Sequence, residues 1–154
     1  NQLGYYSFEL GSWHVVALNS NVDMRRGSPQ ETWLRADLAA HRDTKCTLAY
    51  WHHPRFSSSG VHGNDLRSQD IWRTLHEYKA DLVLAGHEHV YERFAPQDPD
   101  GNLDPATGMR QFIIGTGGAV DIRKLKPLIF TPDTQDYFGV GKFVAKVFSA
   151  GKDI

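Results

Sequence analysis

The chain has 154 residues, of which 40% are hydrophobic and 23% charged, a balance typical of an ordinary globular domain with one core. Its formal net charge of -1 gives no general attraction to nucleic acid or to an anionic membrane, and we expect neither as a partner. Its apolar runs are shorter than the roughly 18 residues of a transmembrane helix. The single cysteine, Cys46, excludes an intramolecular disulfide and a cysteine-based zinc site.

The first predicted element is a β-hairpin. Residues 5–10 and residues 13–18 are both rich in strand-forming side chains. Gly11 and Ser12 between them form a link short enough for the tight turn of a hairpin. We therefore expect two antiparallel strands here, followed by a polar loop over residues 19–27.

A helix is predicted to begin directly after this loop. Ser28 is a suitable N-cap, the proline after it suits the first helical position, and Glu31 completes the pattern of a capping box. Leu34 and Leu38 lie one turn apart on the same side of this helix. The helix should therefore pack on a sheet and continue to about residue 41.

Two short apolar segments, residues 47–51 and residues 81–85, are predicted as buried strands. A second helix over residues 68–79 separates them, and its apolar stripe consists of Ile71, Trp72 and Leu75. The order strand, helix, strand predicts two parallel neighbours joined by a right-handed crossover.

The rest of the chain alternates between loop and strand signals. Residues 97–108 are rich in proline, aspartate and glycine and predict a surface loop. Residues 112–114 form a strand, and the glycine-rich run 115–118 after it predicts a tight turn, because it opens no helix that would cradle phosphate. Residues 138–148 alternate well enough for a last strand. We find no repeat and no linker, so residues 1–154 are predicted to be a single α/β domain.

Histidines follow both predicted buried strands at the point where each strand ends. His52 and His53 follow the first strand, and His87 and His89 follow the second across Gly86. In α/β sheets the ligand-binding crevice lies beyond the carboxyl ends of the strands. Imidazole nitrogens suit zinc, iron or manganese. The sequence therefore predicts a metal site at this edge of the sheet.

The segments around these histidines resemble a known family. Residues 49–52, Ala-Tyr-Trp-His, resemble the fourth motif of the calcineurin-like metallophosphoesterases, and residues 86–89 resemble the fifth, Gly-His-x-His. The continuation Val-Tyr-Glu-Arg at residues 90–93 resembles the purple acid phosphatase branch of the family, in which the fifth motif commonly continues into Tyr-Glu-Arg. With the hairpin before and the glycine-rich strand after, the resemblance covers roughly residues 4–118. It implies half of a four-layer sandwich in which a mixed β-sheet is flanked by helices.

The resemblance also implies an activity and a set of residue roles. The activity is hydrolysis of phosphate mono- or diesters by a hydroxide that bridges two metal ions, with Fe, Zn or Mn as the metals. His52 and His87 would ligate one metal and His89 the other. His62 resembles an outer histidine that contacts phosphate or protonates the leaving group, and it is the predicted catalytic residue. His53 is the alternative to His52 as the metal ligand. The family motif places the ligand two residues before the proline, so His53 is expected to line the pocket or to form a hydrogen bond.

The first three motifs of the family, which supply a bridging carboxylate and further ligands, are absent from this sequence. Residues 63–65, Gly-Asn-Asp, resemble a fragment of the third motif but follow the fourth, so they are predicted to form a turn. We therefore expect the C-terminal part of a metallophosphoesterase domain truncated at its N-terminus, with the missing N-terminal half as its partner. Alone, the chain should bind metal weakly or not at all, be inactive, and self-associate through exposed strand edges. By resemblance, a secreted or periplasmic location is favoured.

Two other interpretations stay open. The chain is a stand-alone metal-binding or interaction module without turnover, or it is a scaffold whose histidine cluster is vestigial. Tight zinc binding by the isolated chain would favour the first, and no metal binding at all would favour the second. The remaining histidines on predicted strands and helices, His14, His41 and His76, are expected to be ordinary surface or half-buried residues.

Overall fold

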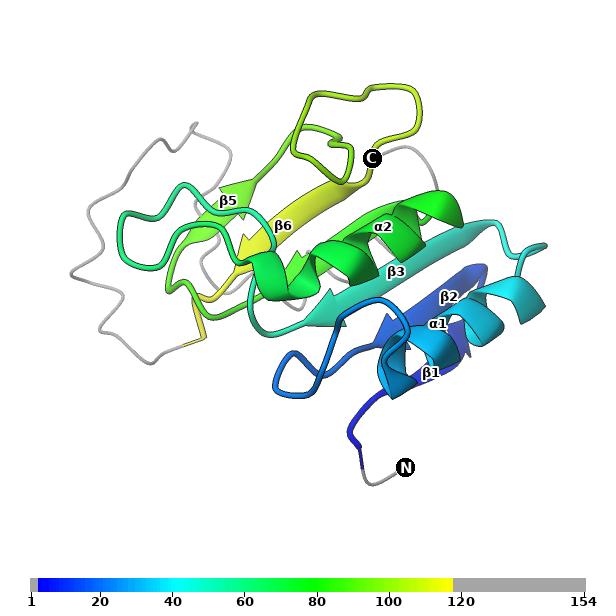
Figure 1. The fold of residues 1–154 in the computed structure, drawn as a ribbon. Coiled ribbons are helices and arrows are strands. Elements are labelled where there is room, and N and C mark those ends of the chain that lie inside the picture. Colours follow the sequence, from blue (N-terminus) through cyan, green and yellow to red (C-terminus); the bar gives the residue numbers. More distant parts are fainter. Residues whose placement is uncertain (1–2, 118–154) are drawn as a thin grey trace.

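The computed structural model describes residues 3–117, which form one mixed six-stranded β-sheet and the helices that pack on it (Figure 1). The strands are β1 (Tyr6–Leu10), β2 (Trp13–Ala17), β3 (Cys46–Trp51), β4 (Leu82–Ala85), β5 (Tyr91–Arg93) and β6 (Arg110–Ile114). The helices are α1 (Pro29–Ala40), the short 3-10 helix η1 (Leu66–Ser68) and α2 (Gln69–Glu77). The predicted strand over residues 138–148 lies outside the described residues.

The strands lie in the order β1-β2-β3-β4-β6-β5 across the sheet. The inner strands β2, β3, β4 and β6 are parallel, and the outer strands β1 and β5 are antiparallel to their neighbours. The predicted hairpin is confirmed, since Leu10 pairs with Trp13 across the two-residue turn. The predicted strand–helix–strand order is also confirmed, because α2 connects the parallel neighbours β3 and β4.

Strand β5 was not predicted. It pairs antiparallel with β6, so that Tyr91 lies opposite Ile114 and Arg93 opposite Phe112. It has only three residues, two of them charged, and gives no alternating pattern over the length that predicts a strand. The edge of β6, which is distant along the chain, supplies its hydrogen-bonding partners.

Both α-helices lie over the same face of the sheet, as Figure 1 shows. Leu34 of α1 and Leu75 of α2 pack there against Val16, Ala49 and Val83 from three neighbouring strands, and all five side chains are buried. Within residues 3–117 no helix is long and apolar enough to span a bilayer. The α/β class is thus confirmed, with the described helices gathered on one face.

The other face of the sheet carries a second buried cluster, which includes Trp13, Leu48, Leu82 and Phe112. Every residue of β2 is buried, which is the expected pattern for an inner strand covered on both faces. Outer strand β1 differs, because its side chains are mostly exposed.

Helix α1 begins as the capping pattern predicts. The Ser28 hydroxyl accepts a hydrogen bond from the backbone N–H of Glu31. The Glu31 carboxylate then accepts from the Gly27 N–H, from the Thr74 hydroxyl of α2 and from Arg35. Glu31, which was predicted only as part of the capping box, therefore also connects α1 to α2.

Candidate metal centre

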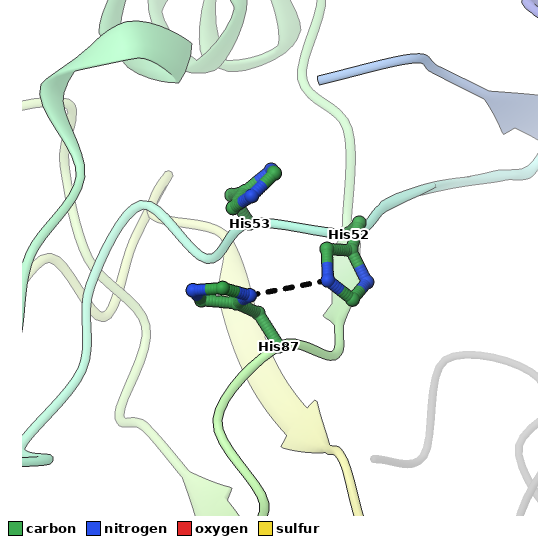
Figure 2. Close-up of side chains that lie close together, drawn as sticks. All are labelled: His52, His53 and His87. Atoms are coloured by element: carbon green, nitrogen blue, oxygen red, sulfur yellow. Dashed lines mark hydrogen bonds between the residues drawn. The ribbon is translucent and has the colours of Figure 1, made fainter. Parts of the chain in front are cut away.

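The strand register brings His52 and His87 together. Trp51, the last residue of β3, pairs with Ala85, the last residue of β4. The Gly86 N–H donates to the carbonyl oxygen of His52 at 3.0 Å, which extends this pairing by one step. Nε2 of His52 and Nδ1 of His87 then lie 3.1 Å apart, as Figure 2 shows. The two imidazoles therefore meet at the carboxyl ends of neighbouring parallel strands.

His53 lies beside the same pair (Figure 2). Its ring centroid is 4.5 Å from that of His87 and 4.8 Å from that of His52. One ligand nitrogen from each of the three residues falls within 4.8 Å of the others. Nδ1 of His53 lies 2.8 Å from the hydroxyl oxygen of Ser20, a buried residue. His53 thus makes a hydrogen bond, as predicted, and also lies within reach of an ion shared by its neighbours.

The backbone around His87 is unusual. His87 has a φ of 63°, in the left-handed region that costs a residue with a Cβ about 1 kcal/mol or more. The next N–H, that of Glu88, turns back to the carbonyl oxygen of Gly86 at 2.7 Å. This turn separates the directions of neighbouring side chains: His87 faces the cluster, whereas Glu88 is buried.

Gly115 permits this turn to pack against the end of β6. A Cβ placed on residue 115 would lie 1.8 Å from the carbonyl oxygen of Glu88, where a side chain has no room. The glycine-rich run was predicted to form a tight turn and not a phosphate cradle. Gly115 accordingly has a packing role, since its missing side chain allows the backbone of the metal-site turn to approach closely.

His62 reaches the cluster from the loop after β3. Its ring centroid lies 4.4 Å from that of His87, and its Nδ1 lies 2.7 Å from a carboxylate oxygen of Glu88. The side chain of His62 is 53% exposed, whereas that of Glu88 is 3% exposed. Sequence reasoning missed Glu88, although its position between the two histidines of the Gly-His-x-His motif was a signal that could have found it.

The electrostatic environment favours neutral imidazoles beside an ionised carboxylate. Burial lowers the pKa of His53, and the nearby Arg67, His87 and His52 lower it further. The pKa of His87 is lowered by burial and by His62 and His52. Burial acts to raise the pKa of the Glu88 carboxyl, but hydrogen bonds from Ser59 and His62 outweigh it and the pKa is lowered. Imidazoles must be neutral to ligate a metal, so the donor set fits a borderline divalent ion.

His89 lies apart from this group. It is exposed, and among residues 3–117 it belongs to none of the sets of ligand atoms within 4.8 Å of one another. Residues i and i+2 point the same way on a strand, but on a turn, as for His87 and His89, they can point in different directions. Its assignment to a second ion therefore stays a prediction.

His14 corrects an expectation from the sequence. It was expected to be an ordinary surface or half-buried residue, but only 1% of it is exposed. Helix α1 covers it and places Asp37 2.7 Å from its Nε2, while Glu9 of the hairpin lies 2.6 Å from its Nδ1. His41 and His76 are half-buried, as expected. His14 is therefore the buried member of an ionic cluster between the hairpin and α1, apart from the candidate metal centre.

Comparison with known proteins gives the family. The sequence profile of the calcineurin-like phosphoesterases matches residues 4–91, which is more than half of the chain. The fold and the paired histidines at the strand ends are consistent with this match, and the chain belongs to the calcineurin-like phosphoesterase family.

Individual relatives include purple acid phosphatases. Purple acid phosphatase 23 of Arabidopsis thaliana is 34% identical over 121 residues, which cover 76% of this chain and 26% of the relative. An uncharacterized protein of Mycobacterium tuberculosis is 32% identical over 171 residues, covering 90% of this chain and 32% of that protein. The solved purple acid phosphatase from yellow lupin seeds has the same fold, with a TM-score of 0.65 and 23% identity over 74% of this chain and 23% of that one. The chain thus spans about a quarter of the length of these plant proteins.

Proposed function

We propose that this chain is the C-terminal part of a metallophosphoesterase domain, and that the complete protein hydrolyses phosphate mono- or diesters at a binuclear metal centre. The observation that carries the proposal is the 3.1 Å between Nε2 of His52 and Nδ1 of His87. Two nitrogens that share a tetrahedral zinc ion at about 2.0–2.1 Å lie about 3.3 Å apart. The pair is therefore spaced to hold one ion with a small adjustment.

The proposed roles follow from position. His52 and His87 hold one ion and His89 the other, with Fe, Zn or Mn as the metals. When bound, such paired ions supply a Lewis acid for the phosphate ester and a water of lowered pKa. Nδ1 of His62 is engaged by Glu88, which leaves Nε2 to bind a phosphate oxygen or to donate a proton to the departing oxygen. His62 is thus the proposed catalytic residue.

The carboxylates that two neighbouring cations need must come from elsewhere in the protein. Among residues 3–117, the sets of ligand atoms that include His87 contain one carboxylate, that of Glu88, and His62 already engages it. Two dications a few ångströms apart repel strongly unless negative charge lies between them. We therefore propose that the N-terminal half of the domain supplies these acids, and that the 154-residue chain alone binds metal weakly and has negligible activity.

The test compares the protein encoded by the complete reading frame with the 154-residue chain. Both are assayed with p-nitrophenyl phosphate and bis(p-nitrophenyl) phosphate in Fe, Zn and Mn. We expect that only the complete protein is active, and that His87→Ala lowers its activity about a hundredfold or more. His76→Ala is the matched control, because His76 pairs with Asp104 on a different part of the fold. A complete protein that is inert with every metal and both esters contradicts the proposal.

A metal-binding module without turnover is the second candidate, and one observation favours it. His52, His53 and His87 bring three imidazoles together within one chain and without any carboxylate. Three histidines alone are sufficient to bind zinc. Tight zinc binding by the 154-residue chain, with no activity in the complete protein, would support this module over the phosphoesterase.

Self-association and location complete the proposal. Tyr6, Phe8 and Leu10 of the outer strand β1 are 52%, 42% and 44% exposed, and such an apolar edge pairs readily with another chain. We propose that the isolated chain self-associates through this edge, which light scattering would detect as a mass above that of a monomer.

A secreted or periplasmic location, supported by the resemblance to purple acid phosphatases, is tested by fractionating the cells that make the complete protein.

A further inference from the structure

We infer that Glu88 is a positioning residue that orients His62 and fixes which of its nitrogens exchanges protons with the substrate, a role that rests on the proposed function. The carboxylate lies 2.7 Å from Nδ1 of His62. It comes from the middle of the Gly-His-x-His turn, whereas His62 comes from the loop after β3. The contact therefore joins two segments that are 26 residues apart along the chain and that both contact His87 or adjoin it.

The fold holds Glu88 inward through the backbone. The left-handed φ of His87 and the Glu88 N–H bond to Gly86 turn residue 88 away from solvent, and its side chain is 3% exposed. The close approach of Gly115 to the Glu88 carbonyl leaves this segment no space to shift toward β6. The Glu88 carboxylate is buried and accepts hydrogen bonds from Ser59 and His62, so its side chain has lost most of its rotational freedom before the substrate arrives, which is what a positioning group requires.

The chemical consequence concerns the tautomer of His62. A carboxylate accepts hydrogen bonds and donates none when ionised, so Nδ1 of His62 must carry a hydrogen. Nε2 is then the nitrogen that accepts or releases the exchangeable proton. Without Glu88, the ring of this exposed loop residue would be free to rotate and to change tautomer.

The contact itself is tested on the 154-residue chain by nitrogen-15 NMR of the histidine rings, at a pH where His62 is neutral. We expect the hydrogen on Nδ1 in the unsubstituted chain and in Glu88→Gln, whose amide oxygen still accepts from it. In Glu88→Ala we expect it to move to Nε2, the tautomer that free imidazole side chains prefer. Glu92→Ala is the matched control, because the Glu92 carboxylate binds Ser57 and Ser58 of the same loop.

The function of the contact is tested in the complete protein with two classes of ester. For alkyl phosphates, whose leaving oxygen needs a proton, we expect Glu88→Ala to lower kcat about 10- to 100-fold with little change in KM. For dinitrophenyl phosphate, whose leaving group departs without a proton, the loss should be within about threefold. Glu88→Gln should recover part of the loss. Glu92→Ala should affect both esters equally, because it disturbs the loop without selecting a nitrogen of His62.

Several results would overturn the inference. One is an Nδ1 hydrogen that persists on His62 in Glu88→Ala, and another is an equal loss for both esters. A third is loss of metal binding in Glu88→Ala as complete as in His87→Ala, which would make Glu88 a ligand. If Glu88→Ala does not fold, the isosteric Glu88→Gln decides through the same ratio of the two esters. A complete protein without activity refutes the proposed function, while the NMR result still decides whether Glu88 sets the tautomer.

Discussion

Nε2 of His14 in β2 lies 2.7 Å from a carboxylate oxygen of Asp37 in α1, across the junction of the sheet and the helix. On the other side of the ring, Nδ1 lies 2.6 Å from a carboxylate oxygen of Glu9. The His41 ring stacks on the His14 ring with 4.0 Å between centroids. With both nitrogens facing carboxylates, the buried ring is suited to the imidazolium form, which connects the edge hairpin to α1.

This cluster predicts a fall in stability as the pH rises. Burial acts to lower the pKa of His14, but Asp37 and Glu9 outweigh it, and the pKa is raised from 6.5. A raised histidine pKa contributes stability that is complete below the unfolded value of 6.5 and is lost as pH rises through the folded pKa. Asp37, whose pKa is lowered despite its burial because His14 and Ser7 bind it, contributes stability above 3.8 that is lost as pH falls through its folded pKa.

Urea denaturation at about pH 5.5 and about pH 8.5, compared between the unsubstituted chain and His14→Gln, measures this effect. We expect His14→Gln to cost about 2–4 kcal/mol at the lower pH and clearly less at the higher. His53 and His87 have lowered pKa values and act in the opposite direction, but both remain in the variant, so the difference isolates His14. A cost that does not change with pH would show that folding does not raise the pKa of His14.

Glu31 should contribute far more stability than a nearby glutamate that shares its partner. It is 2% exposed and accepts from Gly27, Thr74 and Arg35. Glu31→Ala leaves these donors without an acceptor in a buried place, and we expect a loss of about 3 kcal/mol in the free energy of unfolding. Glu77 also pairs with Arg35, but its side chain is 59% exposed, so Glu77→Ala should cost less than about 1 kcal/mol. Equal losses in urea denaturation would contradict this assignment.

Metal binding by the chain should depend on His87. We expect the chain to bind Co²⁺ weakly, which an absorption band in the visible range would report. The Co²⁺ affinity should fall about tenfold or more in His87→Ala. Acidification should release the ion, because protonated imidazoles do not ligate metal. His76→Ala should leave the titration unchanged, and His53→Ala reports whether the third imidazole of the cluster is a ligand. Unchanged Co²⁺ affinity in His87→Ala would refute the proposed centre.

Gly115 should be far less tolerant of a methyl group than Gly117. Gly115→Ala places a Cβ 1.8 Å from the Glu88 carbonyl oxygen, so β6 or the metal-site turn must move. We expect a loss of about 1–3 kcal/mol in stability, together with weaker Co²⁺ binding, because the turn carries both His87 and Glu88. At Gly117 nothing lies within 4 Å of the added Cβ, so Gly117→Ala should change little. Thermal unfolding and the Co²⁺ titration check both variants.

Much of the fold could be predicted because its signals are local. The capping pattern at Ser28 and Glu31 acts within one helical turn, and the structure confirms it. The apolar runs that became β3 and β4 are long enough to indicate strands by themselves. Strand β5 could not be predicted, because its three residues become a strand only through pairing with β6.

The candidate site divides in the same way. His52 and His87 were predicted from their places after two buried strands, and the register of Trp51 with Ala85 brings them together. Glu88 was missed because its burial depends on the left-handed backbone of His87. The burial of His14 was missed for a similar reason, since it depends on helix α1, whose Asp37 lies 23 residues further along the chain.

The sequence by itself determined the elements, the family resemblance and the strand ends at which imidazoles emerge, because periodicity, capping and motif spacing are properties of neighbouring residues. Only the tertiary structure decided which side chains meet. The contacts between His52 and His87 at 3.1 Å, between His62 and Glu88 at 2.7 Å and between His14 and Asp37 at 2.7 Å each join segments that are distant along the chain. Such contacts follow from strand register and helix packing, which the whole core settles together.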